Sequence, residues 1–364
     1  MRKQTATLLS PLLTLFDMNL LRPFKLRPAP FTGLLHIALV IILIGACVTH
    51  FFGEQGQVHL RLAQTTSLST SHSTLSIYLW DFYVENYPDY DAPMDYVSEL
   101  RILDRGDGRN KADLQVDNGT IRMNKPLRYH HYRFCELDYD TDRQGVTLSY
   151  NYDPWGIGIT YTGYALLLVA VIGFFFQRHT VFRSLWDKRH KALIYVLCVL
   201  FLVLTVVMTR HLTPKPPRLP VLHTPLLAVH VSVIMMAYSI FACIMVNGIL
   251  GLCVKKWREK LMNLSRVLIY LAVCCLTAGI FIGAVWANMS WGRYWGWDPK
   301  ETWALITLFV YAGLLHAPIV LPQRWLSGNK RQVAYHICAI VAFCFVLFTY
   351  FGVNHLLGGL HSYA

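Results

Sequence analysis

Residues 34–52 read LLHIALVIILIGACVTHFF, a stretch of nineteen residues without a single Asp, Glu, Lys or Arg. A helix needs about 20 apolar residues to cross roughly 30 Å of hydrocarbon, so this stretch predicts a transmembrane helix. Six further runs of comparable length follow it, near residues 158–176, 192–209, 226–254, 267–287, 302–320 and 333–351. The fold class predicted is therefore a polytopic α-helical membrane protein with about seven transmembrane helices.

The composition leads to the same class. Of the 364 residues, 54% are hydrophobic and 15% are charged, which leaves too little polar surface for a water-soluble particle of this size. The formal net charge is +12, but residues 53–157 hold 16 of the 21 acidic residues and only 10 of the 33 basic ones. The other basic residues gather in short clusters between the apolar runs. A soluble enzyme and a nucleic-acid-binding protein are both excluded.

The basic clusters also indicate how the chain crosses the membrane. They are Arg22, Lys25 and Arg27; Arg178, Arg183, Lys188, Arg189 and Lys191; Lys255, Lys256, Arg258 and Lys260; and Arg324, Lys330 and Arg331. If the runs alternate in direction, all four clusters lie on one side, and basic residues concentrate on the cytoplasmic side. We therefore expect a cytoplasmic N-terminal segment over residues 1–32 and a periplasmic C-terminus.

The polar residues 53–157 then form a domain outside the cytoplasm. Residues 146–152 and 98–103 alternate between apolar and polar side chains, as strands do, and glycines at 106–108 and 117–119 are typical of turns. We predict a small β-rich domain. Its single cysteine, Cys135, excludes a disulfide within it.

An aromatic stretch, WANMSWGRYWGWDPKETW at residues 286–303, holds five of the ten tryptophans between the fifth and sixth runs. An interfacial belt of aromatic residues is one interpretation. Belts, however, spread their tryptophans over many helix ends, so a flat apolar shelf for a planar ligand is equally open. Asp298, Pro299 and Glu301 match an N-cap, a first helical position and a capping box at the start of the sixth run.

Histidines inside a bilayer are costly and usually face the protein interior. His36 and His316 both lie near the cytoplasmic end of their runs, whereas His230 lies near the outer end of its run and His361 lies on the outer tail. Matched depths suggest two bis-imidazole sites, the ligation expected of a low-spin haem. Histidines that each make one hydrogen bond in the core are the alternative.

The second half of the chain resembles a known family. GAVWAN at 283–288, WGRYWGWD at 291–298 and PKETWA at 299–304 resemble the WWD signature of the System II cytochrome c synthases, in the part called CcsA or ResC. LAVHV at 227–231 and GLHSY at 359–363 resemble the segments with the family's external haem ligands, which implies that role for His230 and His361. His316 matches a transmembrane ligand of the family.

The first half resembles the partner part of the same synthases, CcsB or ResB. The matching pieces, in chain order, are GLLH at 33–36, GEQG at 53–56, NKPL at 124–127, DYD at 138–140 and DPWGIGITY at 153–161. The resemblance implies that His36 is the other transmembrane ligand. It divides the chain into a ResB-like region at 33–177 and a haem-handling WWD region at 178–364. The ResB-like region is shorter than is usual in the family, which leaves open whether a separate subunit assists it.

The resemblance implies a fused cytochrome c haem lyase of the bacterial cytoplasmic (inner) membrane. Haem b would bind between His36 and His316 and pass to an outer site with His230 and His361 as iron ligands. There a haem-presenting loop would hold it, formed by Trp291, Gly292, Trp295, Trp297 and Asp298. The partners implied are membrane lipid, an apocytochrome c that brings Cys-x-x-Cys-His, and a thiol-reducing protein or further biogenesis subunit. A haem exporter or chaperone without lyase activity, and a di-haem electron-transfer subunit, remain alternatives.

Overall fold

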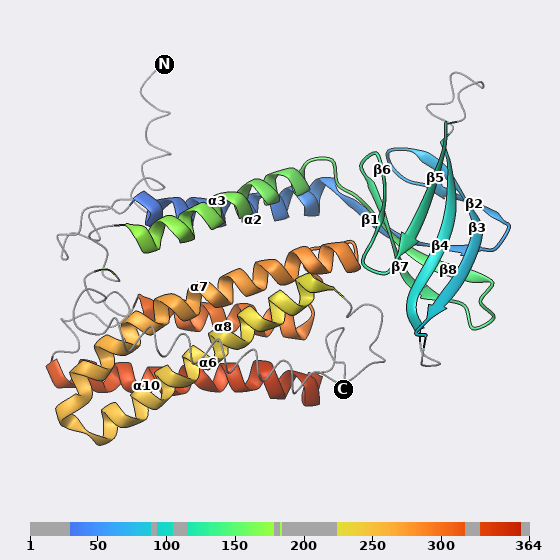
Figure 1. The fold of residues 1–364 in the computed structure, drawn as a ribbon. Helices are drawn as coiled ribbons and strands as arrows, with labels where there is room; N and C mark the ends of the chain where they lie inside the picture. Colours follow the sequence, from blue (N-terminus) through green and yellow to red (C-terminus); the bar gives the residue numbers. More distant parts are fainter. Residues whose placement is uncertain are drawn as a thin grey trace, which may run out of the picture.

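The structure is a computed structural model that describes residues 30–88, 93–104, 115–177, 183, 224–316 and 328–357. The described helices run side by side as an elongated bundle, and a β-sandwich stands at one end of it (Figure 1). We call this the domain end of the bundle and the opposite one the far end. The helices are α2 (Pro30–Phe52), α3 (Gly156–Phe176), α6 (Pro225–Cys253), α7 (Arg258–Ser290), α8 (Pro299–Leu315) and α10 (Gly328–Leu347), which a π-helical segment (Phe348–Leu357) continues.

Five stretches of helix within the described residues are long and apolar enough to cross a membrane. They correspond to α2, α3, α6, α7 and α10 with its continuation, so the predicted membrane protein with a β-rich domain is confirmed. The predicted run at 192–209 lies outside the described residues. Helix α8 covers only part of the run at 302–320, so the count of seven stays a prediction.

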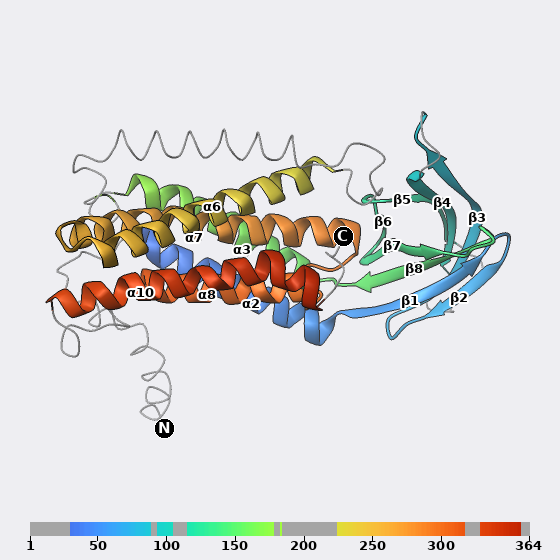
Figure 2. The same ribbon diagram turned by 90° about the horizontal axis from the view of Figure 1, so that it is seen from below.

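Helices α2 and α3 form an antiparallel pair, with the β-domain inserted between them along the chain (Figure 2). Small residues let the two backbones approach: a Cβ on Gly45 would lie 2.3 Å from Thr160 Oγ1, and one on Gly163 would lie 2.6 Å from Ile42. Asp153 holds the start of α3, because its carboxylate accepts from the N–H of Gly156 at 2.7 Å.

The other described helices pack around a second apolar core, in which the rings of Phe241 (α6) and Tyr311 (α8) stack 3.6 Å apart. At the far end, the buried Arg258 guanidinium donates to the carbonyl of Gly251 at 2.8 Å. That carbonyl belongs to the last turn of α6, where backbone oxygens have no partner within the helix. A cation there also faces the negative end of the helix dipole.

The β-domain is a sandwich of two four-stranded antiparallel sheets, ordered β1-β8-β7-β6 and β2-β3-β4-β5. Its strands are β1 (Glu54–Arg61), β2 (Thr65–Ser69), β3 (Thr74–Asn86), β4 (Pro93–Asp104), β5 (Gln115–Arg122), β6 (Leu127–Tyr129), β7 (Tyr132–Tyr139) and β8 (Gly145–Tyr152). Apolar side chains such as Leu75, Ile77, Phe134 and Leu148 fill the space between the sheets. The predicted strands at 98–103 and 146–152 lie in β4 and β8.

One predicted turn is wrong. Residues 117–119 lie inside β5, where Gly119 pairs with Leu100 of β4. A Cβ on Gly119 would lie 2.2 Å from the side chain of Leu127, so glycine is needed there for a close approach between strands rather than for a bend. The other predicted turn, at 106–108, lies outside the described residues.

Candidate functional site

The loop between α7 and α8 covers residues 291–298 and lies at the domain end of the bundle (Figure 1). Trp291 ends α7, and its backbone N–H donates to the carbonyl of Ala287 at 2.7 Å. Gly292 (φ +73°) and Trp297 (φ +55°) have left-handed backbone. Glycine adopts that conformation readily, but a tryptophan does so only where its surroundings hold it, and such residues cluster at functional sites.

The predicted capping box is confirmed at the end of this loop. The Asp298 carboxylate accepts from the N–H of Lys300 at 2.9 Å, and Pro299 takes the first position of α8. In return, Glu301 Oε2 accepts from the N–H of Asp298 at 3.2 Å and from that of Gly296 at 2.8 Å. The buried Asp298 therefore anchors the loop to the start of α8.

The tryptophans do not form the flat shelf that the sequence suggested. Trp295 and Trp297 meet edge to face, with centroids 6.0 Å apart and planes at 87°, and Trp291 meets the buried Trp286 at 69°. Trp303 packs against Phe348 inside the bundle. The ring quadrupole favours such tilted pairs over coplanar ones. Only Trp297 is largely exposed, at 73%, so a planar ligand would meet one open indole and the edges of others.

His230 lies in the second turn of α6, near the domain end. Its Nδ1 donates to the carbonyl of Gly279 on α7 at 2.7 Å. The ring also covers Gly283, where a Cβ would lie 2.5 Å from Cε1, so glycine is required at 283. A hydrogen bond from Nδ1 to a backbone carbonyl is typical of metal-ligating histidines, because it makes Nε2 the nitrogen that can bind iron.

His36 and His316 lie at the far end, near the start of α2 and at the end of α8. Each donates from Nδ1 to a carbonyl of its own helix at 2.7 Å, His36 to Thr32 and His316 to Ala312. Both side chains are exposed, and among the described residues no hydrogen bond or ring contact joins them. Both rings have the same tautomer as His230, and both lie at the far end of the bundle. Within the described residues, however, the two rings do not contact each other.

His336 differs from these three. It is fully buried, it donates from Nε2 to the carbonyl of Arg258 at 3.0 Å, and its ring packs against Gly251. The other three donate from Nδ1 instead, so we interpret the buried His336 as a core residue. His361, the other predicted outer ligand, lies outside the described residues.

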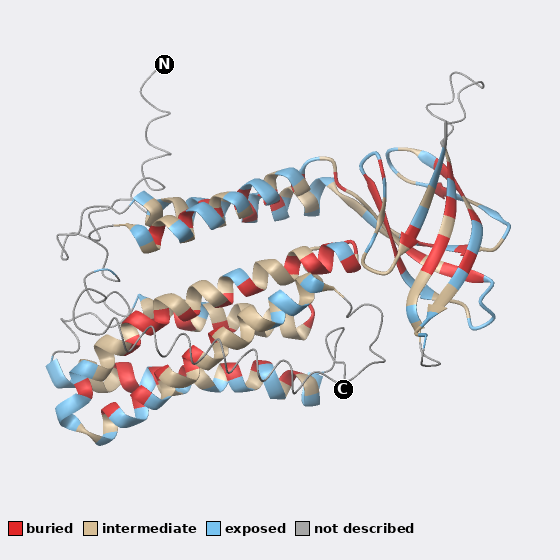
Figure 3. Ribbon diagram, in the orientation of Figure 1, coloured by how far each residue is buried: buried red, intermediate tan, exposed pale blue. Residues whose placement is uncertain are grey.

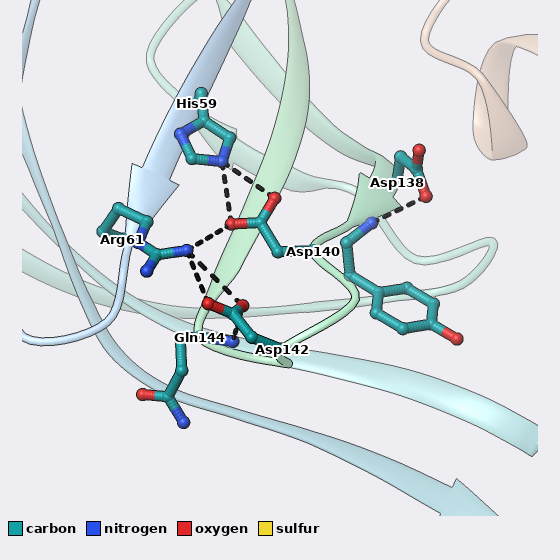
Figure 4. A network of polar contacts seen from close by, with 7 residues as sticks. His59, Arg61, Asp138, Asp140, Asp142 and Gln144 are labelled. Carbon is teal, nitrogen blue, oxygen red and sulfur yellow. Dashed lines mark hydrogen bonds and ion pairs between the residues drawn. The ribbon is translucent and has the colours of Figure 1, made fainter.

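The histidines of the β-domain are not grouped either. His130 and His131 form the turn between β6 and β7. His59 joins a surface network on β1 and the β7–β8 hairpin (Figure 4). There Arg61 binds Asp140 at 2.7 Å and Asp142 at 3.0 Å, and the hydrogen bonds from His59 and Arg61 lower the pKa of Asp140. No group of three or more possible metal ligands occurs within the described residues.

The sequence did not reveal that the β-domain touches the aromatic loop. Arg133 of β7 donates to the backbone carbonyl of Asn288 at 3.3 Å and to its side-chain oxygen, and Asn151 of β8 donates from Nδ2 to the carbonyl of Gly292 at 2.8 Å. Ser290 Oγ donates to Asn124 Oδ1. Figure 3 shows buried residues gathered at the end of α7 that these contacts cover. A polar residue in a strand carries no local signal for such a contact.

The site thus combines an anchored aromatic loop with a histidine fixed by the neighbouring helix. Its side chains can bind and orient a planar aromatic ligand, and imidazole can bind a metal at its centre. Cys135, a thiol beside the loop, is buried, and burial raises its pKa to about 11. It therefore stays neutral near pH 7 and is a poor nucleophile.

Two family models match the chain. Residues 158–361 match the model described as cytochrome C assembly protein, and residues 32–152 match the ResB-like family. The β-domain therefore lies within the ResB-like match, whereas the aromatic loop lies within the assembly-protein match.

Individual proteins are similar over shorter stretches. Protein NrfI of Wolinella succinogenes is 37% identical over 166 residues, which cover 42% of this chain and 18% of that protein. The cytochrome c biogenesis proteins CcsA of Gloeobacter violaceus and Chlamydomonas reinhardtii are 51% identical over 105 residues and 40% identical over 158 residues. These cover 29% and 40% of this chain, and 29% and 43% of the relatives, so each relative is matched over less than half its length.

Proposed function

Because the chain belongs to the cytochrome c assembly protein family, we propose that it carries haem through the membrane and attaches it covalently to apocytochrome c. Haem is the substrate that it moves. The ResB-like match in the same chain supports a fused synthase of the System II type. We assign it to the bacterial cytoplasmic membrane, with the β-domain and the C-terminus in the periplasm.

The observation that carries this proposal is the arrangement of His230 and the aromatic loop at the domain end of the bundle. His230, with Nδ1 bonded to Gly279, lies on the helix beside the one that leads into the aromatic loop. We assign its Nε2 to the iron of haem at an outer site, with His361 as the opposite ligand. Trp291, Trp295 and Trp297 would contact the porphyrin, while Gly292 and Asp298 shape the two ends of the loop.

At the far end, His36 and His316 are assigned to an inner haem site. An exposed imidazole at membrane depth is costly unless it faces a partner or a ligand. Both rings are exposed and both keep Nε2 away from their own helix. That arrangement supports ligation of one iron between them.

The attachment step needs no nucleophile from this chain. In each thioether bond, a client cysteine sulfur joins one carbon of a haem vinyl group and a hydrogen joins the other, so no oxidant is consumed. This chain orients one face of the porphyrin and excludes water, and such positioning contributes about 7 kcal/mol or more in well-oriented reactions. The high pKa of Cys135 keeps that thiol from competing with those of the client.

Co-expression with an apocytochrome c, in a strain without its own synthase, tests the proposal. We expect haem that stays with the cytochrome through acid-acetone extraction, and none with a client whose two Cys-x-x-Cys-His cysteines are replaced by Ala. Bound haem without attachment would indicate an exporter or chaperone. A requirement for a further subunit or a thiol reductant would appear as activity restored by adding it.

A further inference from the structure

Three polar residue pairs join the β-domain to a segment of five residues, from Asn288 to Gly292. Arg133 is 8% exposed, so its guanidinium has left water for this contact. The guanidinium donates to the two oxygens of Asn288, and within the described residues it forms no ion pair. Burying a guanidinium costs free energy unless hydrogen bonds replace its water, and here the two oxygens of Asn288 accept from it.

The second contact fixes the first turn of the loop. Asn151 donates to the carbonyl of Gly292, and the left-handed Gly292 lies directly over Cys135. A Cβ on Gly292 would lie 3.1 Å from Cys135 Sγ. The start of the loop therefore packs against β7 and β8. A methyl group added to Gly292 would crowd the sulfur of Cys135.

The loop is thus held at both ends by different devices. The capping box with Glu301 holds the end that leads into α8 and is local in sequence. The end that leaves α7 is held by residues more than 140 positions earlier in the chain. Without the β-domain contacts, this end of the loop would lose the hydrogen bonds that β7 and β8 donate to Asn288 and Gly292.

We propose that the ResB-like β-domain is a clamp for the aromatic loop, and that Arg133 and Asn151 are positioning residues for it. They act through Asn288 and Gly292 and do not touch haem. The role of the loop in haem attachment rests on the proposed function, whereas the contacts by which the β-domain holds the loop do not depend on it. It gives the β-domain a role in the reaction that none of its histidines supplies.

The first test uses the purified full chain without added haem, with hydrogen exchange of residues 291–298 as the readout. Arg133→Met and Asn151→Asp each replace the hydrogen-bond donor with a side chain of similar size that cannot donate to the same acceptor. We expect these amides to exchange about five- to tenfold faster, as for the loss of a net hydrogen bond or two. Asn288→Asp keeps the accepting oxygen opposite Arg133 and should exchange at the wild-type rate.

Arg61→Met is the matched control, because it makes the same change in the same domain at an exposed ion pair away from the bundle. It should leave residues 291–298 unchanged. Asn124→Asp keeps the oxygen that accepts from Ser290 and tolerates the left-handed backbone at 124. It should therefore also leave the hydrogen exchange of residues 291–298 unchanged. Equal acceleration in Arg61→Met, or none in Arg133→Met and Asn151→Asp, would overturn the clamp.

The second readout is haem. Arg133→Met and Asn151→Asp should keep the copurified haem but change the absorption spectrum of the outer haem and lower attachment several-fold, and Asn288→Asp should retain both. Wild-type attachment with undisturbed spectra and yields in both variants would contradict the clamp. If the wild-type chain attaches no haem, the proposed function fails, while the exchange data still decide whether the clamp exists.

Discussion

The two ends of the bundle hold their histidines in different ways. At the domain end, His230 is bonded to a carbonyl 49 residues away on a neighbouring helix, beside a loop that the β-domain contacts. At the far end, His36 and His316 are each bonded to a carbonyl four residues away in their own helix. His230 is therefore fixed by a contact between two helices, whereas His36 and His316 are each bonded within one helix. This difference suits the proposed function, in which the outer site holds haem in an exact geometry for attachment and the inner site at the opposite end only binds it.

The largest effect we expect is on attachment. His230→Ala should lower covalently attached haem by at least about 100-fold, more than the loss of an outer-shell partner of a metal ligand. Haem at the inner site should remain, because His36 and His316 lie at the other end of the bundle. His36→Ala and His316→Ala should instead lower the copurified haem itself, measured as pyridine haemochrome.

His50→Ala is the control for that comparison, since His50 is exposed near the end of α2 and contacts the ring of Phe51. It should change neither quantity. If His50→Ala abolished attachment as His230→Ala does, the assignment of the outer ligand would be wrong.

The next effect concerns pH and the β-domain alone. Glu136 is 5% exposed between the sheets, and burial raises its pKa to about 7, although Ser98 donates to it at 2.8 Å. Below pH 4.5 the carboxyl is protonated in both the folded and unfolded states. As pH rises towards 7 only the unfolded state releases the proton, so the domain should lose up to about 3 kcal/mol of stability.

Hydrogen exchange of β7 at pH 5 and pH 8, corrected for intrinsic rates, would measure this loss. Glu136→Gln should remove most of the pH dependence while it keeps an acceptor for Ser98. The far end should show no such dependence. Wild-type behaviour in Glu136→Gln would refute the assignment of the effect to this carboxyl.

A smaller effect distinguishes a structural histidine from the two proposed haem ligands at the far end. His336→Ala removes a fully buried ring and leaves the Arg258 carbonyl without its donor, which should lower the stability of the bundle by about 2–3 kcal/mol. Thermal unfolding in detergent would report the loss. The haem content of the folded fraction should stay at the wild-type level, and haem loss as in His36→Ala would identify His336 as a ligand.

The smallest effect concerns the local anchor of the loop. Asp298→Ala should cost about 1 kcal/mol of stability, whereas Asp298→Asn should cost less, because Asn caps a helix nearly as well. Attachment should fall modestly with Ala and be retained with Asn, measured beside thermal unfolding. If Asn failed as badly as Ala in a normally inserted protein, the charge of Asp298 would matter beyond the cap.

Local features of the site could be predicted from sequence. The capping box of Asp298 and Glu301 lies within four residues, so its pattern is visible without a fold. The strand at 146–152 was visible for the same reason. The turn at 117–119 was wrong because Gly119 serves a contact with Leu127 of another strand, which no local pattern encodes.

The arrangement of the rings and the clamp could not be predicted. The planes of Trp295 and Trp297 lie at 87° to each other, an angle that the spacing of the two residues in the sequence does not encode. Arg133 and Asn288 are 155 residues apart and share no motif. Likewise, the contact between His336 and the Arg258 carbonyl joins residues 78 positions apart.

The sequence by itself determined that this chain is a membrane protein with a β-rich domain, and which residues belong to its haem-handling signature. Hydropathy and helix capping depend on residues that are close together in the chain, so both can be recognised from the sequence. The tertiary structure alone decided which tautomer-fixing carbonyl each histidine meets, which tryptophan stays open, and that the β-domain holds the aromatic loop. Those outcomes depend on close packing between segments far apart in the chain, where a difference of an ångström decides whether a hydrogen bond forms.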